Sequence, residues 1–339
     1  MKGVGGLAAL AGAGLALWLL WHEDPRAVLA ALHAAGWGLV LAALIHVLHI
    51  LSNARAWQIL FERVSRPPLR FLFLLTWIRE SVNSLLPVIR VGGDIEAFRL
   101  LLRRGVPVPL AASSLIVDTQ LTVISQLMFT IVGIGFLFSH GESGDLRLAG
   151  DLALGVAVLA PLLAAFALIQ HANPFERVTR VLDRMLSGKL VGTVTASWQV
   201  DEAIKEVWRR RGAVIRYLFF WQPLHYTITS FEIWAALFFL GARVTFVEAL
   251  VIESLIQALS SAAFFVPGAV GVQEGGFIVI GGALGLDPAL CLALAGARRI
   301  RDVVIFVPGL LAWQAVEAPQ VPGGLRYLFS RTLFPRKRQ

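Results

Sequence analysis

The stretch from Arg79 to Arg104 carries more charged and polar side chains than the apolar segments around it. Four of these side chains follow one another at i, i+3, i+4 and i+7, on one face of a helix that would end at a proline: Glu80, Asn83, Ser84 and Pro87. Ionisable groups at membrane depth are costly, so they usually pair with one another or line a pathway. Buried carboxylates of this kind can take up a proton, and arginines can hold a phosphate group.

A second stretch, 264–276, repeats the order of the first at its break. Pro267 is followed by glycines and Glu274, as Pro87 is followed by glycines and Asp94. Proline removes a backbone donor and glycine loosens the chain, so neither stretch is expected to continue as one helix. The sequence therefore predicts two broken elements that each present a carboxylate. A chance likeness is the alternative for so short a match.

Two polar stripes occur in otherwise apolar helical segments, each at i, i+4, i+7 and i+8. Their hydroxyl and amide groups favour hydrogen bonds between helices, which contribute about 0.6 to 2 kcal/mol per contact. Their carboxylates are costly to bury unpaired, so they favour a cavity or an ion pair. The stripes are Asp118, Thr122, Ser125 and Gln126, and Glu253, Gln257, Ser260 and Ser261.

A cluster of arginines separates two apolar runs near the end of the chain, where the topology below predicts the external side or the mouth of a cavity. Two interpretations stay open. The forked guanidinium groups can hold the phosphate of a lipid headgroup, with Arg79 or Arg90 across the cavity. Alternatively, they pair with Asp302, Glu274 or Glu253 and close the helix bundle. The cluster consists of Arg298, Arg299, Arg301 and Asp302.

The histidines and the cysteine give little indication of catalysis or metal binding. His46 and His49 lie three residues apart but have no carboxylate close by in the sequence, so we expect them in packing or helix contacts. The single Cys291 excludes an internal disulfide and a cysteine metal cluster. The motifs HExxH and GxSxG and the Walker lysine loop do not occur. We therefore expect no enzyme, no metal and no cofactor.

The composition is that of an all-α polytopic membrane protein. Of the 339 residues, 57% are hydrophobic and 15% are charged, and the mean hydropathy is +0.72. A soluble domain of this length is much less apolar. The net charge of +8 lies mostly in the connections between apolar runs. This pattern fits membrane topology and anionic lipid better than nucleic acid, which we do not expect as a partner.

The charges of the connections predict their sides of a bacterial inner membrane. The basic connection 171–211 and the basic tail 319–339 are expected in the cytoplasm, and the acidic loop 140–151 outside. The first apolar run, 3–21, is expected to remain as an anchor. An apolar stripe at 175–186 predicts an amphipathic helix on the inner leaflet, or a helix packed on the bundle. Both termini are predicted to be cytoplasmic.

These boundaries divide one integral membrane domain, 1–339, into two halves. The first half, 1–170, holds a hairpin near 79–104, and the second half, 212–318, holds one near 253–297. With both termini inside, the first hairpin enters the membrane from the cytoplasm and the second from outside. We therefore predict an inverted repeat with two re-entrant helical hairpins around a polar cavity.

Several blocks of the sequence together carry a resemblance to a known family. They are ESVNSLLP at 80–87, VGGD at 91–94, RRGVP at 103–107, ES at 253–254, VPG at 266–268, GVQEGG at 271–276 and PGLLAWQ at 308–314. With them the sequence resembles the flippase-like membrane region of lysylphosphatidylglycerol synthases, and more closely the membrane proteins associated with hopanoid biosynthesis. Asp94 stands where the wider family often has glutamate, which keeps the chemistry but shortens its reach.

The resemblance implies a multi-pass protein of the bacterial inner membrane that moves or traffics a lipid, either a hopanoid or an anionic phospholipid. Nothing after Gln314 is long enough for the soluble aminoacyl-transferase domain of the synthases, so we do not expect lipid aminoacylation. The alternative is a partner that presents lipid to a hopanoid-modifying enzyme without transporting it. A lipid transferase would need a base and a donor site that the sequence does not reveal.

The residues expected to line or shape the cavity are the charged, amide and proline side chains of the two broken elements and their neighbours. They are Glu80, Asn83, Pro87, Arg90, Asp94, Asp118, Glu253, Gln257, Pro267, Gln273, Glu274, Arg298, Arg299, Arg301 and Asp302.

Overall fold

The structure is a computed structural model. It describes residues 14–15, 18–19, 21, 25–62, 64–86, 92–140, 191–263 and 266–317. Within these residues every regular element is a helix, which confirms the predicted all-α class. Most of the predicted anchor, the acidic loop and the basic tail lie outside the described residues, as do the stripe at 175–186, Pro87 and Arg90.

Short turns connect most of the helices. The earlier ones are α2 (Pro25–Ala35), α3 (Trp37–Gln58), α4 (Leu69–Leu85), α5 (Gly92–Arg103) and α6 (Val108–His140). The later ones are α9 (Val191–Arg209), α10 (Arg211–Arg216), α11 (Gln222–Phe239), α12 (Phe246–Ala262), α13 (Val272–Ala283), α14 (Pro288–Arg301) and α15 (Val307–Glu317). In the described part, α3 and residues Val108–Leu137 of α6 are long and apolar enough to cross a membrane by themselves.

Two longer helical segments contain a π-helical turn. Tyr217–Trp221 joins α10 to α11, and Asp302–Phe306 joins α14 to α15. The arginine cluster therefore lies inside a continuous helical segment, 288–317, and its predicted place on the external side or at the mouth of a cavity stays a prediction as far as the membrane is concerned. The helical segment that contains the last apolar run of the sequence is therefore longer than that run. Wide turns of this type often occur at functional sites.

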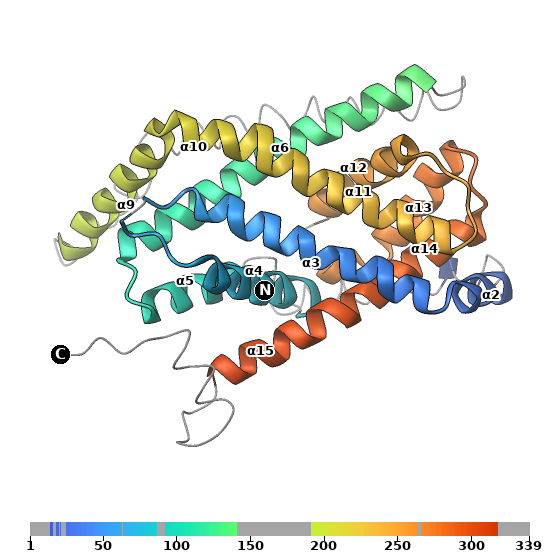
Figure 1. Ribbon diagram of the computed structural model, residues 1–339, viewed down its shortest axis with the longest axis horizontal. Coiled ribbons are helices and arrows are strands. Elements are labelled where there is room, and N and C mark those ends of the chain that lie inside the picture. Colours follow the sequence, from blue (N-terminus) through green and yellow to red (C-terminus); the bar gives the residue numbers. More distant parts are fainter. Residues whose placement is uncertain are drawn as a thin grey trace.

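Two helix pairs of matching size surround the bundle centre. α4 and α12 each have 17 residues, and α5 and α13 each have 12. Within each pair the long and the short helix pack on each other. Figure 1 shows α4 and α5 toward the end where α9 lies, and α12 and α13 toward the opposite end, near α2. The inverted repeat and the opposite entry of two re-entrant hairpins into a membrane stay predictions.

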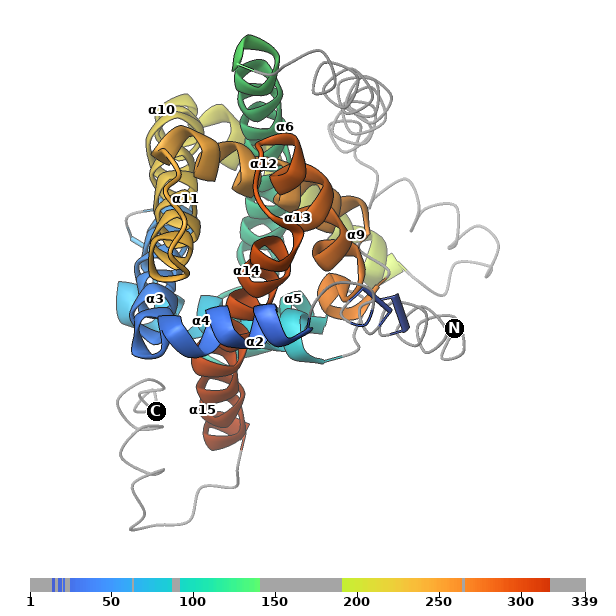
Figure 2. The ribbon, with the colours of Figure 1, turned by 90° about the vertical axis from the view of Figure 1, so that its right-hand side faces the viewer.

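The core forms around α3 and α11, which lie side by side along the bundle (Figure 1). One apolar cluster joins α3 to α4, α5, α6 and α9, and a second joins α3 to α11, α12, α13 and α14. Figure 2 shows α14 within the bundle, between α3 and α13. Charged residues on α14 are consequently surrounded by other helices.

Close backbone contacts hold the broken elements in place. A Cβ added at Gly93 would lie 2.2 Å from the carbonyl oxygen of Arg79, so only glycine allows α5 to approach α4 this closely. The Gly93 amide also donates to Asn83 Oδ1, 2.8 Å away. Across the centre, a Cβ added at Gly268 (φ +61°) would lie 3.5 Å from the carbonyl oxygen of Ser84. The turn before α13 therefore meets the end of α4.

Candidate functional site

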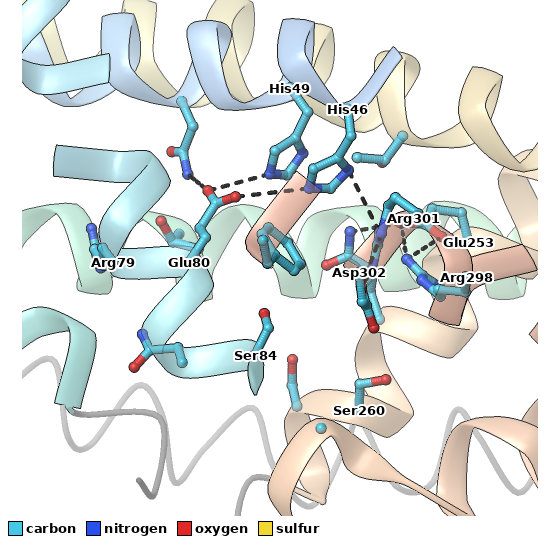
Figure 3. A pocket seen from close by; sticks show the side chains of 18 of the residues that line it. His46, His49, Arg79, Glu80, Ser84, Glu253, Ser260, Arg298, Arg301 and Asp302 are labelled. Atoms are coloured by element: carbon cyan, nitrogen blue, oxygen red, sulfur yellow. Dashed lines mark hydrogen bonds and ion pairs between the residues drawn. The ribbon is translucent and has the colours of Figure 1, made fainter. Parts of the chain in front are cut away.

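A polar cavity of about 540 Å³ lies where the two helix pairs meet, and Figure 3 shows its walls. It receives side chains from α3, α4, α5, α6, α11, α12, α13, α14 and the π turn after α14. The predicted residues that line it are Glu80, Asn83, Asp94, Asp118, Glu253, Gln257, Gln273, Arg298, Arg301 and Asp302. Gly268 lines the cavity beside Pro267, whose backbone begins a short 3₁₀ turn.

Arg79 joins three helices at one wall of the cavity. Its Nε lies 2.7 Å from Asp94 Oδ1, at the start of α5, and its Nη1 donates to Asp118 Oδ2 on α6 at 2.6 Å. The Tyr217 hydroxyl donates to the other oxygen of Asp118 at 2.8 Å. One partly exposed arginine is thus held between two carboxylates, and its charge is compensated within the protein.

Arg298 and Glu253 form a buried pair at the opposite wall. The Nη2 of Arg298 lies 3.0 Å from each carboxylate oxygen of Glu253, which is fully buried. Gln257 also donates to Glu253, at 2.8 Å. The Nε and Nη1 of Arg298 are buried and have no hydrogen-bond partner among the described residues. Arg298 lines the cavity, and these two covered donors are used by no described residue.

Arg299 and Glu274 lie next to the cavity and hold the turn before α13. Arg299 donates to Glu274 Oε1 at 2.8 Å and to the carbonyl oxygen of Gly268 at 3.0 Å. The other oxygen of Glu274 accepts from the amide of Gly271 at 2.6 Å, at the N-cap of α13. Asp94 has a matching place in the first turn of α5. In each helix pair, a carboxylate at the start of the short helix binds an arginine.

Arg301 connects α14 with α11 and, through it, with α3. It pairs with Asp302 at 2.5 Å and donates to Glu232 Oε1 at 3.3 Å. Glu232 Oε2 lies 2.7 Å from His46 Nδ1. Sequence reasoning missed Glu232, although it is the one carboxylate between residues 213 and 240. The cost of burying a charge in such an apolar run was the signal that identified Asp118 and Glu253.

Glu80 lies opposite the two histidines of α3. Its Oε1 is 3.4 Å from His49 Nε2, and its Oε2 is 3.8 Å from His46 Nε2 (Figure 3). Asn53 donates to Glu80 Oε1 at 3.0 Å. The expectation that these histidines lack a nearby carboxylate is therefore wrong. The carboxylate is close in space but lies on the next helix, so spacing along the chain did not reveal it.

The charges of the cavity leave an excess of carboxylates. Three arginines and five carboxylates line it, so its net charge is negative by two if its histidines are neutral. Each lining arginine contacts at least one carboxylate. Of the two interpretations left open for the arginines, the structure contains the ion pairs that close the bundle. A ligand with net negative charge would have to compete with these carboxylates for the arginines.

One of the comparisons with known proteins gives a match, and it is to a protein family. The protein family described as the lysylphosphatidylglycerol synthase TM region matches residues 4–309. No curated protein and no solved structure matches the chain. The match confirms the family that the sequence blocks indicate, while the closer relation to hopanoid-associated proteins stays a prediction. The chain belongs to the family of lysylphosphatidylglycerol synthase transmembrane regions, a family of membrane proteins in lipid-related processes.

Proposed function

We propose that this protein transports a membrane lipid, and that the polar cavity takes up the headgroup while the acyl or ring body remains in the bilayer. The observation that carries this proposal is the polar cavity of about 540 Å³ where the two helix pairs meet, which is lined by arginine and amide side chains. Guanidinium and amide groups can donate hydrogen bonds to the oxygens of a headgroup. Large exposed apolar side chains on α3 and α11, including Leu41, Leu48 and Phe238, support contact with lipid outside the cavity.

The charges that line the cavity favour some headgroups over others. The excess of two negative charges favours a headgroup that has acceptor oxygens but no net negative charge. A hydroxylated hopanoid or a zwitterionic lipid meets this condition. An anionic phospholipid meets it poorly, because the carboxylates in excess would repel its net negative charge. The headgroup preference is therefore a narrower proposal than transport itself.

Lipid retention tests whether the cavity holds a headgroup. Thr119 of α6 and Ser261 of α12 line the cavity with exposed side chains, so a tryptophan at either position would take up part of its volume. The protein would be extracted gently from its own membranes, and native mass spectrometry with lipid analysis would identify the retained lipid. We expect one enriched lipid class in the wild type and its loss in Thr119→Trp and Ser261→Trp.

The control is Val279→Trp, which adds a similar side chain at a position 55% exposed on α13 and outside the cavity lining. It should retain lipid as the wild type does. If the same lipid remains on both cavity-filled variants, the lipid binds elsewhere and the proposal fails. If an anionic phospholipid is the species lost, the cavity is supported and the proposed headgroup charge is wrong.

A further inference from the structure

The two histidines of α3 and the carboxylate of Glu80 form a compact group of nitrogen and oxygen atoms. One candidate ligand atom from each residue lies within 4.8 Å of the others. The rings of His46 and His49 stack with centroids 4.2 Å apart and an angle of 16° between their planes. Figure 3 shows both rings pointing from α3 toward Glu80 on α4. Of the two histidines, His46 contacts an arginine of the cavity wall, Arg301.

The hydrogen bonds around His46 leave its second nitrogen facing an oxygen without a proton between them. Glu232 Oε2 lies 2.7 Å from His46 Nδ1, and an ionised carboxylate can only accept, so Nδ1 carries the hydrogen. In a neutral ring, Nε2 then presents a lone pair. That atom is buried, has no hydrogen-bond partner among the described residues, and lies 3.8 Å from Glu80 Oε2. Two facing lone pairs in a buried site favour a cation between them.

One of the separations between candidate ligand atoms matches that around a single metal ion. Zinc binds histidine nitrogen at about 2.0–2.1 Å and carboxylate oxygen at about 2.0–2.2 Å, so two ligands at a tetrahedral angle are about 3.4 Å apart. His49 Nε2 and Glu80 Oε1 are 3.4 Å apart. His46 Nε2 lies 3.8 Å from the other oxygen, Oε2, so one ion between the three residues requires the carboxylate and at least one of the nearly parallel rings to rotate.

The surrounding residues orient the candidate ligands as they do in metal sites. Histidine ligands commonly donate their other N–H to a carboxylate, and carboxylate ligands are themselves hydrogen-bonded. Glu232 has the first role toward His46, and Asn53 has the second toward Glu80. Arg301 in turn donates to Glu232 at 3.3 Å. The ring of His225, 4.2 Å from that of His49, packs against the other histidine.

We propose that His46, His49 and Glu80 bind a divalent first-row transition metal of the class that prefers mixed imidazole and carboxylate ligands, such as zinc or ferrous iron. All three residues line the cavity, so a further coordination position is open toward it. This inference is independent of lipid transport. An extra proton on His46 is the competing occupant of the same gap, and the experiment distinguishes the two.

The test is zinc binding by the full-length protein, purified in detergent with a tag that contains no histidine. After incubation with zinc and removal of the excess, we expect stoichiometric zinc in the wild type by elemental analysis and a rise in the Tm on zinc addition, because ligand binding stabilises the folded state. His49→Ala and Glu80→Gln should lose the bound zinc and the Tm rise. Glu232→Gln should retain the site with about 10- to 100-fold weaker affinity.

His33→Ala is the matched control, since His33 lies on α2 and does not line the cavity. It should bind zinc as the wild type does. Size-exclusion chromatography identifies variants that fail to fold, and only folded variants are compared. A folded wild type that takes up no zinc and shows no Tm rise overturns the proposal and leaves a protonated histidine as the cation. Full zinc retention in folded His49→Ala and Glu80→Gln also overturns it.

Discussion

The ion pair between Arg298 and Glu253 illustrates how single residues control this cavity. Both groups are buried, and each compensates the charge of the other. The desolvation of such a pair is large, so its net contribution to stability can be small even though the loss of one partner is severe. The apolar context of the sequence identified both residues as unusual. It did not identify them as partners, because 45 positions of the chain separate them.

Replacing one member of this pair should cost far more than replacing both. We expect Arg298→Leu to destabilise the protein by about 3–5 kcal/mol, because Glu253 is left as an uncompensated buried charge. The double variant Arg298→Leu/Glu253→Leu should recover most of this loss. Thermal unfolding in detergent measures both effects. Arg209→Leu, which disrupts the exposed pair with Glu206, is the control and should change stability by less than about 1 kcal/mol. A double variant as unstable as the single one would contradict this account of the pair.

The sequence predicted breaks between helices where proline and glycine determine them. It did not determine the ion pairs between helices that are far apart in the sequence. Proline and glycine located the ends of α4 and α12 and the starts of α5 and α13. The topology predicted the arginines of α14 on the external side or at the mouth of a cavity, and two interpretations of their partners stayed open. Their partners, including Glu232 and Glu274, come from other helices. Pairing across helices allows the helical segment to continue through them.

The opposite entry of the two helix pairs can be tested by cysteine labelling. Pro107 follows the first pair, Arg243 precedes the second, and both are exposed. In a background with Cys291→Ala, Arg243→Cys should react with a membrane-impermeant maleimide added to intact spheroplasts. Pro107→Cys should react only after permeabilisation, because the first pair is predicted to enter and leave on the cytoplasmic side. Labelling of both cysteines from the same side would contradict the inverted arrangement.

At the scale of the whole molecule, the two halves bring their polar groups to one cavity. Composition predicted a helical membrane protein, and the repeated proline, glycine and carboxylate pattern predicted a polar cavity between broken elements. The contacts that shape it could not be predicted, since Glu80 faces α3, and Arg301 faces Glu232 of α11. Arg103 of α5 also pairs with Glu317 at the end of α15, 2.6 Å away. The end of the first helix pair therefore meets the end of the second half.

Lipid movement in reconstituted liposomes tests the proposed transport most directly. The assay would follow the transfer between leaflets of a fluorescent lipid that carries the headgroup identified on the purified protein. It would compare protein-free liposomes with wild type, Thr119→Trp, Ser261→Trp and Val279→Trp. We predict that the wild type and Val279→Trp accelerate transfer and that the two cavity-filled variants approach the rate without protein. Equal acceleration by all four proteins, or none by the wild type, would contradict transport through this cavity.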